Sequence, residues 1–493
     1  MVTPPNLDSQ SAVPLYRQLH SHFERLIQSG QLARGERLPA TRELAGMLGL
    51  NRTTVSAAYE LLESEGLIAG HVGRGSFVIG GPAPATGGIS WESLLDRFVG
   101  PEAAPLSLPG KNGISFAASR PSEQLFPLDA LRASCEEVMA QPDFASILQL
   151  GASSGYEPLR RYLLERARSQ DLARPGDDLI VTSGCQQALD LIARVLLGPR
   201  DKVLLEDPVY PGLKNLFAVH GAELLGVPVT AEGIDVEQLE RILAGERPRL
   251  LVATSNFQNP TGATLPLAAR QALLRAARRS GVVVVENDLY GELRYRGDPL
   301  PGLKQLDESG DVVLLRSFSK ITFPGLRVGW VIAPKPLVAC LAQAKQLSDL
   351  HTDQFSQAVL LRFAESGRLE EHRQRMLHNG SERLAAVLAA CERYLPPEAR
   401  FTRPQGGMNL WVRLPEPLDA GELLARALRE QVAYLPGRYF AVSRPEPGSL
   451  RLSFAGLTPE EIRRGLSILG GIFGEELERV RANRAVEPAP ALV

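Results

Sequence analysis

The 493-residue sequence has few cysteines and contains no long apolar run. Its four cysteines, Cys135, Cys185, Cys340 and Cys391, lie far apart and form no CxxC pair or Cys/His cluster, which argues against a disulfide framework and a zinc site. No apolar stretch approaches the length of about 18 residues that a membrane helix requires, and the N-terminus lacks the features of a secretory signal. We therefore expect a cytoplasmic protein that binds no metal and does not span a membrane.

Charge of one sign is also lacking, because the formal net charge is only −2. This balance argues against a surface that wraps nucleic acid on all sides, but it allows a local DNA-binding face. The cations are 47 arginines and only seven lysines. A protein that needs a reactive amine therefore has few candidates here.

Residues 12–79 form a self-contained pattern of short helices followed by a glycine-rich hairpin. Apolar residues recur at helical spacing in three stretches, 14–28, 42–48 and 53–65. Leu67-Ile68 and Phe77-Val78 then flank a turn that contains three glycines, which predicts a β-hairpin. The order is helix, turn, helix and a candidate wing.

The third helical stretch opens with Asn51, Arg52, Thr53 and Thr54. A recognition helix inserts its N-terminal residues into the major groove, where hydroxyl and guanidinium groups reach phosphates and base edges. The alternative is a plain helical bundle, in which these residues only cap a helix and face solvent. Residues 1–80 hold seven arginines and seven acids, so charge does not decide between the two.

The rest of the chain has a different pattern. Residues 80–110 are rich in Pro, Gly and Ala, which predicts a linker. In residues 111–481, apolar strands such as DLIVTSG, KVLLEDP and GVVVVEND alternate with helical stretches. This alternation predicts a mainly parallel sheet covered by helices on both faces, the α/β class. We expect the tail, residues 482–493, to be disordered.

Lys320 is the candidate reactive amine. In SFSKITFPGLRVGW it follows a predicted strand that ends in hydroxyl residues, among them Ser317, and Arg327 follows after a Pro-Gly bend. A lysine that forms a Schiff base must be desolvated, and a phosphate beside it needs hydroxyls and a guanidinium. Most lysines after strands are simply solvated, so this string does not decide alone.

Other strings offer groups of the same kind. Gly184, Cys185 and Gln186 form a strand-to-helix turn whose free N–H groups can bind a phosphate, although such turns are common. Tyr210 could stack on a flat ring or could be an ordinary core residue. Polar residues also follow or interrupt strands that should be buried, at Asn259, Asn287, Asp288, Tyr290 and Arg451. Buried polar groups need partners, and a buried guanidinium implies an anion such as a carboxylate.

The strings PLYRQL, LPATRELAGMLGLNRTTVSAAYELLESEGLI and GRGSFV resemble the winged helix-turn-helix of GntR-type bacterial regulators across essentially all of residues 12–79. This resemblance implies contacts to double-stranded operator DNA from Arg42, Arg52, Thr53 and Thr54 and, at the wing tip, from Gly73 and Arg74. Ser56 stands where some relatives have another basic residue.

The C-terminal strings, in their order, resemble fold-type I pyridoxal-phosphate aminotransferases. The resemblance implies pyridoxal 5′-phosphate as cofactor, bound covalently to Lys320. It further implies a phosphate site made by Ser317, Arg327 and the turn at Gly184, Cys185 and Gln186. Around the ring, it implies that Tyr210 stacks on the pyridine, that Asn259 and Tyr290 contact the ring hydroxyl, and that Asn287 lies at the ring nitrogen. It also implies that Arg451 binds a substrate carboxylate. The whole chain, winged helix, linker and aminotransferase-like domain, resembles the MocR subfamily of GntR regulators.

Two positions depart from the aminotransferase pattern. Asn287 stands where the family has an aspartate, which keeps the ring nitrogen protonated as an amide cannot. Asp288 should not substitute, because adjacent side chains of a strand face opposite ways. Leu150 replaces a tyrosine that usually reaches the neighbouring subunit's phosphate. Both departures are expected to weaken transamination more than cofactor binding.

The sequence therefore favours a homodimeric transcriptional regulator that senses an amino acid or amine through its cofactor domain. One alternative is a working aminotransferase with a DNA-binding appendage. Another is a winged helix fused to a scaffold that binds no cofactor, which the intact set of Ser317, Lys320, Arg327 and Tyr210 disfavours.

Overall fold

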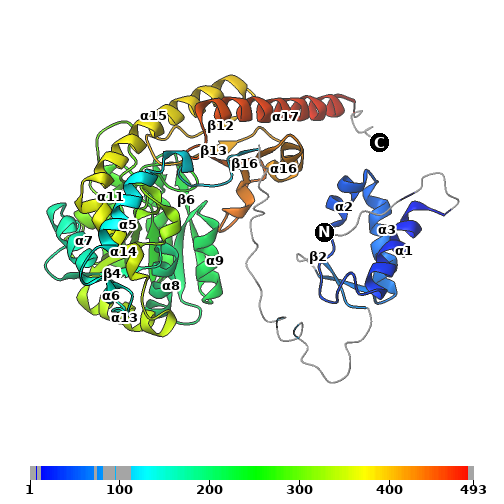
Figure 1. Ribbon diagram of the computed structural model, residues 1–493. Helices are drawn as coiled ribbons and strands as arrows, with labels where there is room; N and C mark the ends of the chain where they lie inside the picture. The colour runs from blue at the N-terminus through cyan, green and yellow to red at the C-terminus, as the bar shows by residue number, and fades with distance from the viewer. Residues whose placement is uncertain are drawn as a thin grey trace. The chain divides into compact units, whose positions relative to one another are not determined.

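The computed structural model describes residues 7, 13–71, 75–80, 91, 95 and 113–486, and the chain divides into two compact units, Met1–Gly100 and Pro101–Val493 (Figure 1). Most of the predicted linker lies outside the described residues, as do Gly73 and Arg74 of the predicted wing tip. Within the described ranges, no helix is long and apolar enough to cross a membrane.

The first unit is a three-helix bundle followed by a hairpin. Its elements are α1 (Leu15–Gln28), α2 (Thr41–Leu48), α3 (Arg52–Ser64), β1 (Ile68–His71) and β2 (Gly75–Val78). The two strands are antiparallel, with Ile68 opposite Val78, and these two residues join the buried core of the helices. The helices and the hairpin predicted from the apolar spacing are therefore present.

The turn between α2 and α3 follows from two residues. Gly49 ends α2 with a φ of 66°, a conformation that favours glycine. Asn51 begins α3, because its side chain accepts a hydrogen bond from the Thr53 N–H at 3.2 Å. Together they set the angle of a helix-turn-helix.

The second unit is built on an eight-stranded sheet. The strands are β4 (Asp177–Thr182), β5 (Lys202–Asp207), β6 (Glu223–Thr230), β7 (Gly233–Ile234), β8 (Leu250–Ala253), β9 (Val283–Asn287), β10 (Val312–Ser317) and β11 (Gly329–Pro334). Their order is β4-β11-β10-β9-β8-β5-β6-β7, with β11 antiparallel to both neighbours and β7 antiparallel to β6. The other neighbours are parallel, so the prediction of a mainly parallel sheet is confirmed.

Helices cover both faces of this sheet, as expected for the α/β class. Val285 and Leu315 pack on one face with α8 (Cys185–Leu196), α9 (Pro211–Val219) and α13 (Lys335–Ser348). On the opposite face, Val284 and Leu314 belong to the clusters that include α7 (Glu157–Ser169), α10 (Val236–Gly245), α11 (Leu267–Ser280) and α14 (Gln354–Glu365). Short helices α5 (Leu128–Met139), α6 (Phe144–Ile147) and α12 (Leu303–Leu306) complete this part. Consecutive residues at the end of β9 therefore face different sides of the sheet.

A smaller antiparallel sheet follows, in the order β12 (Arg400–Phe401), β13 (Asn409–Arg413), β16 (Ser449–Ser453) and β15 (Leu435–Pro436). One face of β13 and β16 buries Leu410, Val412, Leu450 and Leu452 in a core shared with α15 (Arg368–Tyr394), α16 (Ala420–Arg429) and α17 (Pro459–Val486). At the start of the unit, β3 (Ile114–Ser115) pairs in parallel with β14 (Val432–Ala433).

The prediction of disorder from residue 482 onward needs correction, because α17 continues to Val486. The sequence ANRA is rich in good helix formers, and the first proline after it is Pro488. Residues 487–493 lie outside the described residues.

His372 of α15 is fully buried against the rings of Phe323 and Phe363, each with its centre 6.4 Å away. Neither ring nitrogen has a hydrogen-bond partner within the described part of the chain. Burial, together with the charge of Arg375, lowers the pKa of His372 to about 4. The imidazole is therefore neutral at physiological pH.

We predict that this histidine makes the fold sensitive to acid. Unfolding restores an ordinary pKa of about 6.5, so between about pH 6.5 and pH 4 the unfolded chain binds a proton that the folded chain does not. As the pH is lowered through that window, the free energy of unfolding should decrease. His372 should contribute at most about 1.4 kcal/mol per pH unit to this decrease. His372→Phe should reduce this slope in denaturant titrations. The exposed His378 of the same helix gives the control, His378→Phe, and equal slopes for all three proteins would contradict the prediction.

Candidate functional site

Lys320 ends a short 3₁₀ helix, Phe318–Lys320, that directly follows β10. Its Nζ donates a hydrogen bond to the carbonyl oxygen of Ser119 at 2.7 Å and lies 5.7 Å from the centre of the Tyr290 ring. No carboxylate in the described ranges forms an ion pair with this amine. Lys320 is thus a lysine held by a carbonyl and an aromatic ring, which suits a reactive amine better than a structural ion pair does.

Tyr290, Asn259 and Arg451 form a chain of polar contacts beside Lys320. The Tyr290 hydroxyl lies 3.3 Å from Ser119 Oγ and 3.5 Å from Asn259 Nδ2. Asn259 Oδ1 in turn accepts a hydrogen bond from Arg451 Nη1 at 3.0 Å. Burial would raise the pKa of the Tyr290 hydroxyl, but the charges of Lys320 and Arg451 and the contact with Ser119 outweigh it and lower the pKa.

Arg451 lies in β16 and is 3 % exposed. Its second Nη donates to the carbonyl oxygen of Ala117, and the guanidinium lies 5.1 Å from the centre of the Phe440 ring. Burial lowers the pKa of Arg451 to about 10, and its Nε has no partner within the described part of the chain. A buried guanidinium without a counter-charge is suited to an anionic ligand.

The turn before α8 brings Gly184 against Arg327. Gly184 has a φ of 83°, and a Cβ there would collide with the Arg327 guanidinium. Arg327 donates to the carbonyl oxygen of Ser183 at 3.3 Å. The N–H groups of Cys185 and Gln186 lie in the first turn of α8, where helical N–H groups have no intrahelical acceptor. A guanidinium beside a helix N-terminus can bind a phosphate.

Ser317 and the Cys185 thiol lie close to this turn. Ser317 Oγ accepts from the Ser319 N–H at 3.0 Å and donates to the Val328 carbonyl at 3.1 Å. The Cys185 thiol donates to the Arg316 carbonyl at 3.3 Å, and burial raises its pKa to about 12. Cys185 therefore offers its backbone N–H, not a thiolate.

A polar cluster that the sequence did not predict forms hydrogen bonds with the turn before α8. Gln187 Nε2 donates to Asp349 at 2.6 Å, and its Oε1 accepts from the Ser183 N–H at 2.8 Å. The fully buried Lys345 donates to both Gln187 and Asp349 at 2.8 Å. The only sequence signal was the helical i, i+4 spacing of Lys345 and Asp349.

Tyr210 precedes α9 as its N-cap residue and is 45 % exposed. Burial of the hydroxyl and the neighbouring Tyr290 raise the pKa of Tyr210, and the charges of Arg451 and Arg327 oppose this increase. An exposed aromatic ring in this position can stack on a flat ligand.

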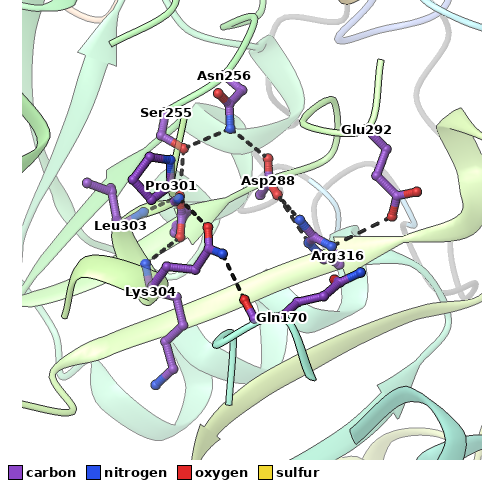
Figure 2. A network of polar contacts seen from close by, with 12 residues as sticks. Gln170, Ser255, Asn256, Asp288, Glu292, Pro301, Leu303, Lys304 and Arg316 are labelled. Carbon is purple, nitrogen blue, oxygen red and sulfur yellow. Dashed lines mark hydrogen bonds and ion pairs between the residues drawn. The ribbon is translucent and has the colours of Figure 1, made fainter. Parts of the chain in front are cut away.

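Asn287 and Asp288 have separate surroundings. Asn287 Oδ1 is buried without a partner among the described residues. The Asp288 carboxylate instead accepts from Arg316 at 2.6 and 3.1 Å and from Asn256 at 3.3 Å. Figure 2 shows this network, in which Arg316 also approaches Glu292 at 3.6 Å. The side chain of Asp288 is thus committed to Arg316, as the alternation along β9 predicts.

The predicted DNA-contacting residues lie at the starts of two helices in the first unit. Arg52 and Thr53 are exposed at the start of α3, Thr54 is half-buried, and Arg42 is exposed near the start of α2. The opposite side of α3 packs into the core, through residues such as Val55. This arrangement leaves the N-terminal end of α3 accessible for a groove.

Four exposed leucines lie in two segments of the second unit, which we call the leucine surface: Leu148, Leu150, Leu347 and Leu350. Leu347 is 91 % exposed. Gln354 joins the two segments by donating to the Gln149 carbonyl at 2.7 Å. The second segment also contacts the turn before α8, because Thr352 Oγ1 lies 3.3 Å from Ser183 Oγ.

Two family models match this chain. The model of aminotransferase class I and II matches residues 117–469, and the model of bacterial regulatory proteins of the gntR family matches residues 15–78.

Relatives of two kinds are similar to it. The 2-aminoadipate transaminase of Thermus thermophilus is 38% identical over 78% of this chain and 97% of its own. The probable rhizopine catabolism regulatory protein MocR of Rhizobium meliloti is 30% identical over 95% of both chains. Among solved structures, α-aminoadipate aminotransferase of Thermus thermophilus, complexed with N-(5′-phosphopyridoxyl)-L-leucine, matches 79% of this chain and 100% of its own with a TM-score of 0.74 and 37% identity.

Proposed function

This chain belongs to the GntR-family regulators that carry a class I and II aminotransferase domain, and from this premise we propose that an amino acid or amine bound beside Lys320 changes how the protein binds DNA. It is a DNA-binding transcriptional regulator of the MocR type, and its cofactor is pyridoxal phosphate. We propose the class of effector and the coupling of effector binding to DNA binding.

The residues of the second unit fit this cofactor. Buried polar atoms of Asn287 and Arg451 have no protein partner in the described ranges, and Arg327 adjoins a helix N-terminus suited to a phosphate. When bound, pyridoxal phosphate supplies a carbonyl carbon for which Lys320 and an incoming amine compete. The groups we assign to it are Lys320 for the covalent bond, Ser317, Arg327 and the turn at Gly184, Cys185 and Gln186 for the phosphate, Tyr210 for the ring face, Asn287 for the ring nitrogen, and Asn259 and Tyr290 for the ring hydroxyl.

One observation favours sensing over catalysis: Asn287 replaces the acid at the ring nitrogen, and Asp288 is bound to Arg316. A carboxylate at position 287 would hold a proton on that nitrogen, whereas an amide only donates or accepts a hydrogen bond. Binding of an amino compound needs Lys320 and Arg451, which are both present. Proton removal from the bound compound needs the missing charge.

A short segment offers a route from this site to the DNA-binding unit. Lys320 and Arg451 donate to the carbonyl oxygens of Ser119 and Ala117, which follow β3 near the start of the second unit. An effector that engages both cations competes with these two contacts. This segment is joined to the DNA-binding unit through the predicted linker, and we propose that its release from Lys320 and Arg451 alters how the protein binds DNA. The equilibrium shifts only by the effector's differential affinity for the two arrangements.

We predict that Lys320→Ala abolishes the effector response but not DNA binding. An operator would be selected from random double-stranded DNA with the full-length holoprotein, and its affinity measured by fluorescence anisotropy with and without a panel of L-amino acids and amines. The wild type should respond to at least one compound, and Lys320→Ala should bind the operator equally well without any response.

Two variants serve as controls for this experiment. Lys335→Ala, at the start of α13, should keep the response. Arg52→Ala should lose about 5- to 150-fold in operator affinity, if Arg52 reads a base edge worth about 1–3 kcal/mol. An unaltered effector response in Lys320→Ala would overturn the assignment of Lys320.

The second candidate function is a working aminotransferase, favoured by the 38% identity to a transaminase. We predict slow keto-acid formation by the wild type in single-turnover assays with L-2-aminoadipate, the amino acid named for the Thermus thermophilus relative, and with L-phenylalanine. Asn287→Asp should speed this conversion by about tenfold or more, because each 1.4 kcal/mol of recovered stabilisation is worth about a factor of ten. Rapid wild-type conversion that the substitution does not change would favour the aminotransferase instead.

We also infer a homodimer in which the leucine surface is covered by the second copy. Exposed apolar side chains that cluster in this way are typical of protein–protein contacts. The surface adjoins the turn proposed to bind phosphate, through Thr352 and Ser183. A dimer would also present two winged helices to two half-sites of an operator.

Leu347→Asp should disrupt this dimer, because it introduces a charge into a contact that would be desolvated. Light scattering of the holoprotein at micromolar concentration should report a dimer for the wild type and a monomer, or a large rise in the dissociation constant, for the variant. Leu267→Asp, at the start of α11, changes an exposed leucine outside this surface and should leave the dimer intact. A wild-type monomer with cofactor bound would contradict the inference.

A further inference from the structure

Asn409 is a buried asparagine whose amide has no hydrogen-bond partner among the described residues. It begins β13 and is 1 % exposed, and both Oδ1 and Nδ2 are buried without a partner. A buried amide in this state carries a desolvation penalty that no protein contact offsets. Such groups in native proteins call for a specific explanation, and a ligand is one of the few available.

The strand register puts Asn409 on the same side as Arg451. Trp411 lies directly opposite Arg451, and Asn409 precedes Trp411 by one full alternation of the strand. Leu410 and Leu452, which pair between these two positions, point the other way into the C-terminal core. The face of this small sheet that carries Asn409 is therefore the face that carries the buried guanidinium.

Asn409 also lies near the Tyr290 hydroxyl. It helps to lower the pKa of that hydroxyl, yet the two groups make no hydrogen bond of good geometry. Neither amide atom of Asn409 forms a hydrogen bond that meets the usual geometry with Tyr290 or Arg451. Its donors and its acceptor remain available to a bound molecule.

Arg451 has the matching capacity left over. Of its five N–H donors, one on each Nη is taken by Asn259 Oδ1 and the Ala117 carbonyl. Nε is buried without a partner. A carboxylate has about four lone-pair sites that can accept hydrogen bonds. The donors on one edge of the guanidinium cannot satisfy all of them. A neutral amide donor on the same face can bind the oxygen lone pairs that Arg451 leaves open.

We propose that Asn409 is a specificity-determining residue that donates a hydrogen bond from Nδ2 to the carboxylate of an effector bound at Arg451. This inference rests on the proposed function and makes it more specific, because the effector class becomes α-amino acids rather than simple amines. The amide discriminates by leaving a buried donor unpaired whenever the carboxylate is absent.

Three small probes separate the contributions of the amine and the carboxylate: L-alanine, ethylamine, which lacks the carboxylate, and propionate, which lacks the amine. Binding of the first two to the full-length holoprotein would be followed by cofactor absorbance, and binding of propionate by ligand-observed NMR. We expect Asn409→Leu, which keeps a similar volume, to raise the dissociation constants of L-alanine and propionate by about tenfold. That of ethylamine should change by less than about twofold.

Asn409→Asp tests the sign of the interaction, because a carboxylate there repels the ligand's carboxylate. This substitution should raise the dissociation constants of L-alanine and propionate more than Asn409→Leu does. Asn379→Leu, on α15, is the matched control, since the Asn379 amide donates to the Arg375 carbonyl of its own helix. Thermal unfolding of all variants should show that Asn409→Leu is at least as stable as the wild type, because it removes an unpartnered amide from the interior.

Several results would overturn the proposal. Equal weakening of L-alanine and ethylamine would assign Asn409 to Tyr290 or the cofactor, and unchanged propionate binding would remove it from the carboxylate site. Failure of the wild type to bind propionate would exclude the carboxylate site itself. If L-alanine and ethylamine leave the absorbance of the wild type unchanged, the proposed sensing function fails, and the propionate measurements alone still decide the role of Asn409.

Discussion

Two cations in the second unit, Lys320 and Arg451, donate to backbone carbonyls of one short segment, and neither forms an ion pair with a carboxylate of the described residues. A carboxylate partner would neutralise either cation within the protein and would compete with any anionic or carbonyl ligand. Carbonyl oxygens satisfy the donors without cancelling the charge, so the charges stay available. The same choice ties the site to the segment around Ala117 and Ser119, which continues from the DNA-binding unit. Under the proposed function, an effector that engages both cations competes with these two hydrogen bonds.

The alternation of side chains along β9 places neighbouring residues on opposite faces of the sheet. Val285 faces α8, and Asn287 is two residues further along the same strand, whereas Glu286 is buried on the other side. Asp288 is occupied by Arg316, so an acid next to the right position in sequence is not an acid in the right place. A shift of one residue would have restored the charge. The difference between a sensor and an efficient transaminase can thus rest on one side chain, although the fold of the two is shared.

Much of this architecture is readable from the sequence, because its signals are local. Helical apolar spacing, Gly49 and Asn51 predict the helix-turn-helix, and apolar runs such as KVLLEDP predict the strands of the large sheet. The polar residues that follow those strands were recognised for the same reason, and parallel strands bring their ends to one edge. Arg451 stood out because a charge in SLRLSFA breaks an apolar strand.

What the sequence did not reveal depends on backbone atoms or on distant pairs. The carbonyls of Ala117 and Ser119 have no signature, since every residue has a carbonyl. Lys345 and Gln187 meet only after α8 and α13 pack together. Asn409, like Arg451, is a polar residue in an apolar strand, since it begins NLWV. Without the pairing of β13 with β16, however, a polar residue at this position indicates only the start of a strand. Register is the missing information in that case.

The unpartnered buried groups of this unit also bear on its stability. Asn287 and Arg451 each leave one buried polar atom, and Asn409 leaves two, without a partner among the described residues, and each such atom costs the folded state about 1–3 kcal/mol. Apolar residues of similar size would make a more stable interior at these positions. Molecules that bind only the folded chain offset this cost in proportion to their occupancy. Such groups destabilise the protein without ligand more than the protein with ligand, so they increase the free-energy difference between these two states. A ligand-controlled regulator depends on that difference.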